Sequence, residues 1–131
     1  MDNPQQKVWD GCTGKERCVV AYFAPWCPIC HKNVAFFKEL RRQLTHAPKV
    51  GLVYIVGYDR LTACEDLAAE IGSPIHLDPR REFDKIADFG SVPYFWVLDK
   101  DRMVLTDFAW TGSRNDNMRT AVEHFIESRL E

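Results

Sequence analysis

The chain has 131 residues, enough to bury a hydrophobic core, and we expect residues 1–131 to form a single domain. Hydrophobic residues make up 46% and charged residues 27%, an ordinary balance for a globular protein in water. The net charge of −2 argues against nucleic acid or membrane surfaces as partners, because either would normally require a basic patch. The polar N-terminal stretch 1–11 is not a signal peptide, which fits a cytosolic protein or an exported domain whose leader was removed.

Continuous apolar runs predict two buried strands early in the chain. The β-rich run at 18–24 predicts the first strand and the run at 50–58 the second, each buried on both faces. Between them, apolar residues recur at helical spacing, which predicts one helix from about Pro28 to Leu44. Pro28 suits the first turn, where its missing N–H is not needed.

Strands and helices continue to alternate in the rest of the chain. The predicted elements are a helix at 62–72, a strand at 74–77, a helix at 78–90, strands at 94–98 and 103–109, and a helix from Ser113 or Asn115 to about Arg129. Gly72 ends the first of these helices, and Asp78 caps the second. The two close strands form an antiparallel hairpin. This order predicts an α/β fold with a mixed central sheet, covered on both faces by helices.

The motif CPICH at 27–31 is compatible with three kinds of chemistry: c-type haem attachment, zinc binding and a redox-active cysteine pair. A haem would need a mostly helical shell, whereas this motif follows a buried strand. Zinc needs four ligands, and Cys18 and Cys27 lie at opposite ends of one strand, roughly 25 Å apart at about 3.3 Å per residue. We therefore expect no metal and no cofactor.

The redox interpretation has a physical mechanism. Cys27 lies where a helix begins, so backbone N–H groups and the helix dipole stabilise its thiolate, and we expect it to be exposed at the helix tip. Cys30 lies one turn further along and faces the core, near enough to close a disulfide. The pair would then act as a reversible two-electron switch.

Two segments resemble the thioredoxin superfamily: VVAYFAPWCPIC and, further along the chain, SVPYFWVLDKD. The stretch PIHLDPRREFDKIADFGSVP is similar to the exported TlpA/ResA-like branch, in which a strand and a helix are inserted before a cis-proline. The resemblance covers residues 15–130. It implies a thioredoxin fold with that β-α insertion and the activity of a thiol–disulfide oxidoreductase.

The resemblance also implies a role for each matching residue. Cys27 would attack a substrate disulfide and Cys30 would resolve the mixed disulfide. Pro93 would be cis and lie beside the cysteines, and Val92 would offer its backbone to an extended substrate. The expected substrate-binding residues are Trp26, Pro28, Ile29, Val92 and Pro93. Ile29 carries no charge that could favour oxidising chemistry, so the dipeptide between the cysteines favours a reductase.

The sequence departs from the superfamily pattern at Ala21, where many thioredoxins carry a buried acid that helps to move the proton of the resolving thiol. Either Asp59 or Glu39 takes that role through water, or proton transfer is less assisted. The residues do not decide between these alternatives.

The remaining cysteines leave further alternatives open. Cys12 and Cys18 could pair, or Cys18 could be a small buried residue at the start of a strand and Cys12 a loop thiol. Cys64 is expected to pack in a helix. His31 is expected to be partly exposed, with a minor electrostatic effect on Cys27.

We therefore predict a monomeric thiol–disulfide oxidoreductase that acts on protein substrates with a disulfide or dithiol, and that exchanges electrons with a second redox protein. The inserted element favours a periplasmic or other extracytoplasmic location, with the cytoplasm as the alternative. A non-catalytic thioredoxin-fold binding module is the alternative function. A thiol peroxidase is disfavoured, because Ala24 stands where peroxiredoxins require Thr or Ser.

Overall fold

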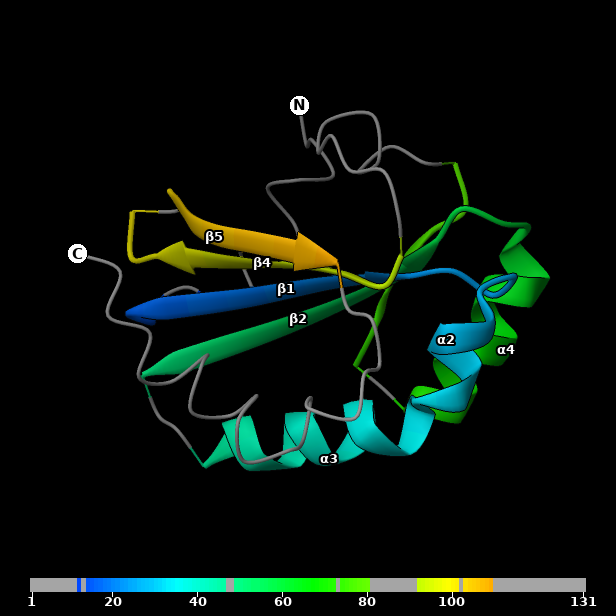
Figure 1. Ribbon diagram of the computed structural model, residues 1–131, viewed down its shortest axis with the longest axis horizontal. Helices are drawn as coiled ribbons and strands as arrows, with labels where there is room; N and C mark the ends of the chain where they lie inside the picture. Colours follow the sequence, from blue (N-terminus) through cyan, green and yellow to red (C-terminus); the bar gives the residue numbers. More distant parts are fainter. Residues whose placement is uncertain are drawn as a thin grey trace.

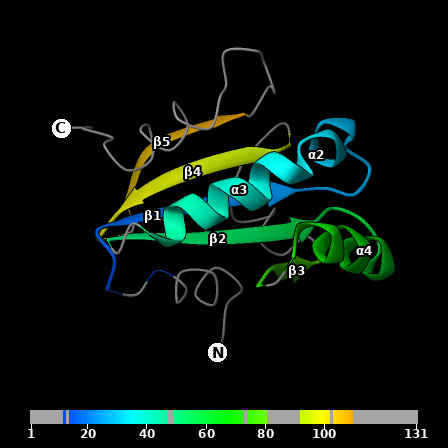
Figure 2. The same ribbon diagram turned by 90° about the horizontal axis from the view of Figure 1, so that it is seen from below.

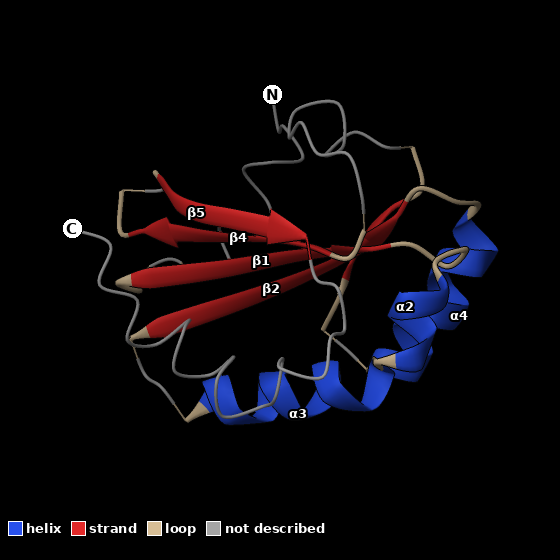
Figure 3. Cartoon of the chain, in the orientation of Figure 1, coloured by secondary structure: helices blue, strands red, loops and turns tan. Residues whose placement is uncertain are grey.

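The computed structural model describes residues 12, 14–46, 49–72, 74–80, 92–101 and 103–109. Within these residues the chain forms one five-stranded sheet of order β3-β2-β1-β4-β5 (Figures 1 and 3). The strands are β1 (Arg17–Phe23), β2 (Val50–Gly57), β3 (His76–Asp78), β4 (Tyr94–Asp99) and β5 (Val104–Ala109).

The sheet is mixed, as the sequence predicts. Strand β1 pairs with β2 in parallel, and β2 pairs with β3 in parallel. Strand β4 runs antiparallel to both β1 and β5, and with β5 it forms the expected hairpin. The carboxyl ends of β1, β2 and β3 therefore meet at one edge of the sheet, which is where loops can bring reactive side chains together.

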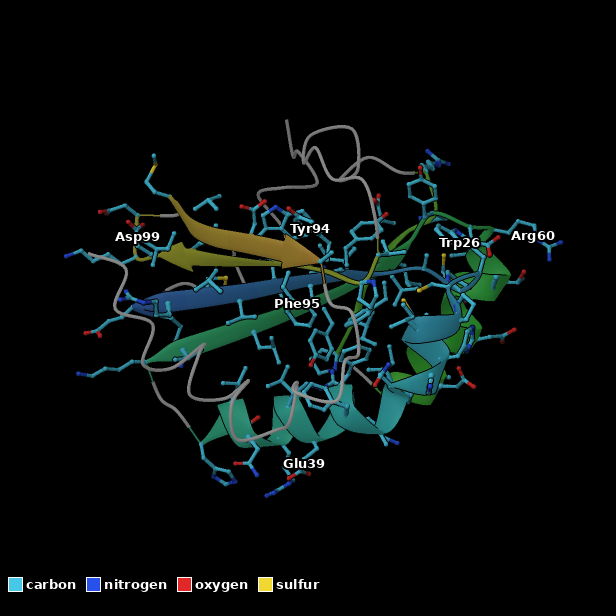
Figure 4. The ribbon with its side chains drawn as sticks, viewed as in Figure 1. Trp26, Glu39, Arg60, Tyr94, Phe95 and Asp99 are labelled. Carbon is cyan, nitrogen blue, oxygen red and sulfur yellow. A yellow bond between two sulfur atoms is a disulfide. The ribbon has the colours of Figure 1, made fainter. Side chains whose placement is uncertain are left out.

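Strand β1 lies at the centre of the sheet, and all but its first residue are buried. A strand with neighbours on both sides and packing on both faces needs a continuous apolar sequence, as β1 has. On one face Phe23 packs against Phe37, with ring centroids 4.6 Å apart. Alternation along β4 is visible in Figure 4, where Tyr94 and Phe95 point to opposite faces.

Three described helices cover one face of this sheet (Figure 2). They are α2 (Pro28–Lys32), α3 (Val34–Thr45) and α4 (Leu61–Ile71). Gly72 follows α4 with a φ of 99°, in the region that favours glycine, so the predicted end of that helix is confirmed. No helix among the described residues is long and apolar enough to cross a membrane.

The prediction of one unbroken helix from Pro28 to Leu44 was wrong. The chain leaves helical geometry at Asn33, whose φ and ψ are −110° and 18°, and continues as α3. The Asn33 side-chain amide donates to the backbone oxygen of Ile29 at 2.9 Å. Asparagine side chains compete with the helical hydrogen-bond ladder in this way, and the apolar spacing alone does not reveal it.

Asp78, predicted as a helix cap, makes a buried contact with β1, and the helix that it would cap lies outside the described residues. Asp78 ends β3, is 7% exposed, and its carboxylate accepts a hydrogen bond from the Tyr22 hydroxyl at 2.7 Å. Gly57 makes this pair sterically feasible, because a Cβ at that position would overlap both the Tyr22 hydroxyl and the Asp78 backbone. The body of the helix predicted at 78–90 and the helix predicted after Ser113 lie outside the described residues.

Candidate active site

The first cysteine of the CPIC motif lies in the loop that leaves the carboxyl end of β1. Cys27 is the N-cap of α2, with an extended backbone (φ −88°, ψ 114°), and Pro28 is the first residue of the helix. The Cys27 sulfur accepts a hydrogen bond from the backbone N–H of Cys30 at 3.3 Å. This N–H is one of the donors that the start of a helix leaves without a backbone partner, so it favours negative charge on the sulfur.

Both cysteines are shielded from solvent. Cys27 is 3% exposed and Cys30 is fully buried. The expectation that Cys27 would be exposed at the helix tip was wrong, because the loop that precedes β4 lies against its sulfur. The Cys27 thiol donates to the backbone oxygen of Val92 at 3.5 Å.

The two thiols have unlike environments. Burial, together with the neighbouring sulfur of Cys27, raises the pKa of the Cys30 thiol well above its ordinary value. Cys30 is therefore held as a protonated thiol, while the sulfur of Cys27 receives the N–H bond at the helix start. The pair is therefore asymmetric, because the Cys27 sulfur accepts a backbone N–H bond while the Cys30 thiol keeps its proton.

The Val92–Pro93 peptide bond is cis, the isomer that the sequence resemblance implies. Pro93 is buried and Val92 is half-buried, and the Val92 carbonyl lies against Cys27 as described above. Val92 is 65 positions from Cys27 in the sequence. The antiparallel pairing of β4 with β1 brings Val92 and Pro93 beside it, since Tyr22 near the end of β1 pairs with Tyr94 at the start of β4.

Three other predicted residues line the surface next to Cys27. Trp26 is 54% exposed, Pro28 is exposed and Ile29 is half-buried. The Trp26 indole N–H donates to the backbone oxygen of Tyr58 at 2.8 Å, and the two rings meet edge to face with centroids 5.6 Å apart. Trp26 is thus held in place although it is exposed.

Tyr58 is a site residue that the sequence analysis missed. It follows β2 directly and has a φ of 67°, in the left-handed region that a tyrosine rarely adopts. A positional signal was present in the sequence. The carboxyl ends of neighbouring parallel strands lie at the same edge of a sheet. Tyr58 is the last residue of the strand predicted at 50–58, and Trp26 lies just beyond the strand predicted at 18–24.

Within the described part of the chain, neither acid suggested as a proton acceptor contacts Cys27 or Cys30. Glu39 lies on α3, away from Trp26 in Figure 4, and hydrogen bonds from Arg42 and Gln43 lower its pKa to about 2. The Asp59 carboxylate accepts the backbone N–H of Arg60 at 2.7 Å.

The cysteine pair whose bonding the sequence left open forms a disulfide. Cys12 and Cys18 are joined, with their Cα atoms 5.6 Å apart, at the end of β1 opposite to Cys27. Gly51 pairs with Cys18 across the strands, and a Cβ at Gly51 would lie 2.7 Å from the Cys12 sulfur. A glycine on β2 therefore makes room for this crosslink.

The third free cysteine, Cys64, is fully buried on α4, as its expected packing role requires. Burial raises the pKa of its thiol. Among the described residues, no group of three or more His, Cys, Asp or Glu side chains could hold a metal ion.

Comparison with solved structures gives matches over most of the chain. A secreted Mycobacterium tuberculosis disulfide oxidoreductase homologous to E. coli DsbE is 15% identical, with a TM-score of 0.66, and the match covers 84% of this chain and 80% of that one. StoA from Bacillus subtilis is 18% identical, with a TM-score of 0.68 and coverage of 82% and 81%. A putative thiol:disulfide interchange protein DsbE from Chlorobium tepidum is 15% identical, with a TM-score of 0.73 and coverage of 93% and 84%.

No protein-family model and no curated protein sequence matches the chain. The mixed sheet, the helix that begins at the CPIC motif and the structural matches agree with one another. The chain therefore has the thioredoxin fold.

Proposed function

We propose that this protein is a thiol–disulfide oxidoreductase that exchanges electrons with protein disulfides through Cys27 and Cys30. The observation that carries the proposal is the asymmetry of the pair. The sulfur of Cys27 accepts an N–H bond at the start of α2, whereas burial keeps Cys30 protonated. A nucleophilic cysteine needs hydrogen-bond donors at its sulfur, as Cys27 has. A resolving cysteine needs to stay protonated until the mixed disulfide has formed, as the burial of Cys30 favours.

The exchange consumes one substrate disulfide and forms one protein disulfide. The Cys27 thiolate attacks a substrate sulfur, so that a Cys27–substrate bond forms, the substrate S–S bond breaks, and one substrate sulfur leaves as a thiolate. Cys30 then loses its proton and attacks the Cys27 sulfur, which releases the second substrate thiolate. Two electrons pass to the substrate, and Cys27 and Cys30 end as a disulfide.

The proton of Cys30 must leave during the second step. Ala21 stands where the superfamily pattern has an acid, and Glu39 and Asp59 have other partners. We propose that the thiolate released by the substrate in the first step accepts this proton, directly or through water. A substrate thiolate formed next to Cys30 is a stronger base than a carboxylate, because its ordinary pKa is about 8.5 against about 4 for a carboxyl group.

The surface beside Cys27 supplies a binding site for an extended substrate segment. Val92 offers its backbone for strand-like pairing, and Pro93 beside it has no N–H to compete. Trp26, Pro28 and Ile29 add apolar contacts on the other side of the sulfur. The Val92 oxygen, which accepts from the Cys27 thiol in the free protein, becomes available when that thiol ionises or forms the mixed disulfide.

We further propose that the protein works as a monomeric reductase outside the cytoplasm, and that a second redox protein returns electrons to it. The Cys12–Cys18 disulfide supports this location, since disulfides persist in oxidising compartments and are rare in the cytosol. One of the structural neighbours is described as secreted. Ile29 between the cysteines carries no charge and supports the reducing direction.

A turnover assay tests the proposal. The wild-type protein should reduce the interchain disulfides of insulin in the presence of a small-molecule dithiol. Cys27→Ser should abolish this activity, and Cys64→Ser, a matched change at a buried free thiol, should retain it. Equal activity of wild type and Cys27→Ser would show that the cysteines are incidental and would favour a binding module. The reduction potential of the pair then gives the direction, and a value near −120 mV rather than about −270 mV would contradict a reductase.

A further inference from the structure

His31 follows Cys30 on α2, and its imidazole ring lies between two oxygen atoms from other segments. Nε2 is 2.5 Å from the backbone oxygen of Pro25, two residues before Cys27. Nδ1 is 3.2 Å from the carboxylate of Glu70 in the last turn of α4. The ring is 46% exposed, in agreement with the expectation of partial exposure, and these two contacts define what we call the His31 bridge.

The hydrogen-bonding capacity of imidazole determines when this bridge is complete. A neutral ring has one N–H, so it can donate to only one of the two oxygens, and its other nitrogen then faces an oxygen lone pair. The imidazolium donates to both. The charged group that faces the ring from α4 is Glu70, and Lys32 is the adjacent charge on its own helix. Both oxygens are therefore satisfied together only when His31 is protonated.

The bridge closes the segment that contains both redox cysteines. Two other contacts reach distant parts of the chain from this segment, the Trp26 indole to Tyr58 and the Cys27 thiol to Val92. The rest are local, from the Cys27 N–H to the Ala24 oxygen and from the N–H groups of Cys30 and His31 to Cys27. The side chain of His31 joins the beginning of the turn to its end, and through Glu70 it joins the turn to α4. The cysteines are unpaired in this conformation, so the bridge is present in the reduced form.

We propose that His31 is a positioning residue for the exchange at Cys27 and Cys30, and that its protonated form links the reduced active-site turn to α4 through Glu70. The inference rests on the proposed function and deepens it. Closing the Cys27–Cys30 disulfide draws the two sulfurs together and, in this proposal, moves the turn away from Glu70, so the bridge should shift the redox equilibrium of the pair toward the dithiol. An exposed ion pair of this kind corresponds to about a two- to fivefold change in an equilibrium constant.

Equilibration with glutathione measures this effect. We compare wild type with His31→Gln, Glu70→Gln and Asp66→Asn, in which Asp66 is a control acid exposed on the same helix. At about pH 5.5, where an imidazole is largely protonated, the first two variants should favour the disulfide about two- to fivefold relative to wild type, and the control should not. At about pH 8.5 the difference should disappear. A merely structural contact would change the free energy of unfolding without this pH dependence.

The ¹⁵N resonances of the His31 ring provide a second readout that does not depend on exchange. The Nδ1 resonance should shift in Glu70→Gln, which loses the carboxylate partner, and should be unchanged in Asp66→Asn. An unchanged Nδ1 resonance in Glu70→Gln, or equal glutathione equilibria for wild type and His31→Gln at both pH values, would overturn the bridge. If wild type fails to exchange with glutathione at all, the proposed function fails, and the ring resonances still decide whether the bridge exists.

Discussion

Breaking the Cys12–Cys18 disulfide should lower the free energy of unfolding by about 2 kcal/mol. The two cysteines are six residues apart. For a loop of that size, the loss of chain entropy that the crosslink imposes on the unfolded state gives about 2 kcal/mol at 25 °C. With an m-value of about 1–3 kcal/mol per molar urea, the midpoint of unfolding should fall by roughly 0.7–2 M.

The experiment needs a background in which the other disulfide cannot form. A Cys27→Ala, Cys30→Ala double variant leaves Cys12–Cys18 as the disulfide to be tested and Cys64 as a free thiol. Urea unfolding is then followed with and without reductant, and Cys12→Ser in the same background should match the reduced value. Without reductant, the unfolded protein should show one thiol that reacts with an alkylating reagent. Three reactive thiols, or one midpoint under both conditions, would refute the crosslink.

Gly51 allows an independent check of the same crosslink. Gly51→Ala would place a Cβ 2.7 Å from the Cys12 sulfur, so it should destabilise the disulfide-bonded protein by about 1–3 kcal/mol. In the Cys12→Ser background the uncrosslinked segment can move away, and the loss should be at most half as large. An equal loss in both backgrounds would mean that the strain has another source.

Two further predictions concern buried groups. Tyr22→Phe removes the hydroxyl that donates to the buried Asp78 carboxylate, so it should lower the free energy of unfolding in urea by about 1–3 kcal/mol. Tyr94→Phe removes an exposed partner of Asp107 and should change that free energy little. Equal losses in the two variants would contradict a buried hydrogen bond between Tyr22 and Asp78. Because the pKa of Cys30 is raised in the folded protein, stability from this thiol is present below its ordinary value of 9.0 and is lost as pH rises above it. The reduced protein should therefore lose stability relative to the disulfide form between about pH 8 and 10, and parallel pH curves for the two forms would argue against a buried, protonated Cys30.

Much of the fold is predictable from the sequence, because central strands are continuous runs of apolar residues. The apolar runs at 18–24 and 50–58 became β1 and β2 within one residue at each end, since a strand buried on both faces has no room for polar residues. The hairpin at the end of the sheet was also predicted, from two β-rich runs and a short polar turn.

The break in the first helix was missed because the apolar spacing does not show the effect of a single asparagine. The Asn33 side chain bonds to Ile29, four residues earlier, and asparagine is a poor helix former because of such bonds. A tertiary contact leaves no local pattern at all, as with the Tyr22 hydroxyl of β1, which donates to the Asp78 carboxylate 56 residues away.

The site residues inside the C-x-x-C motif were predictable from the sequence. Most contacts that distant segments make with this motif were not. Cys27 and Cys30 follow from the C-x-x-C spacing, and Pro93 from the resemblance of its segment. The shielding of Cys27 depends on the Val92 carbonyl, which arrives from a segment 65 residues away. Glu70 was missed for the same reason, because its contact with His31 depends on how α4 packs beside the active-site turn. Tyr58 was missed although it lies at the end of a predicted strand, at the edge of the sheet where Trp26 also lies.

Trapping a mixed disulfide tests most directly whether Cys27 is the nucleophile of the pair. The Cys30→Ser variant removes the resolving thiol, so a reaction with a disulfide-bonded protein such as insulin should stop after the first step. Peptide mapping under non-reducing conditions should find the substrate joined to Cys27, and the complex should release its substrate when a dithiol is added. No covalent complex, or a complex joined through Cys64, would contradict thiol–disulfide exchange at the start of α2.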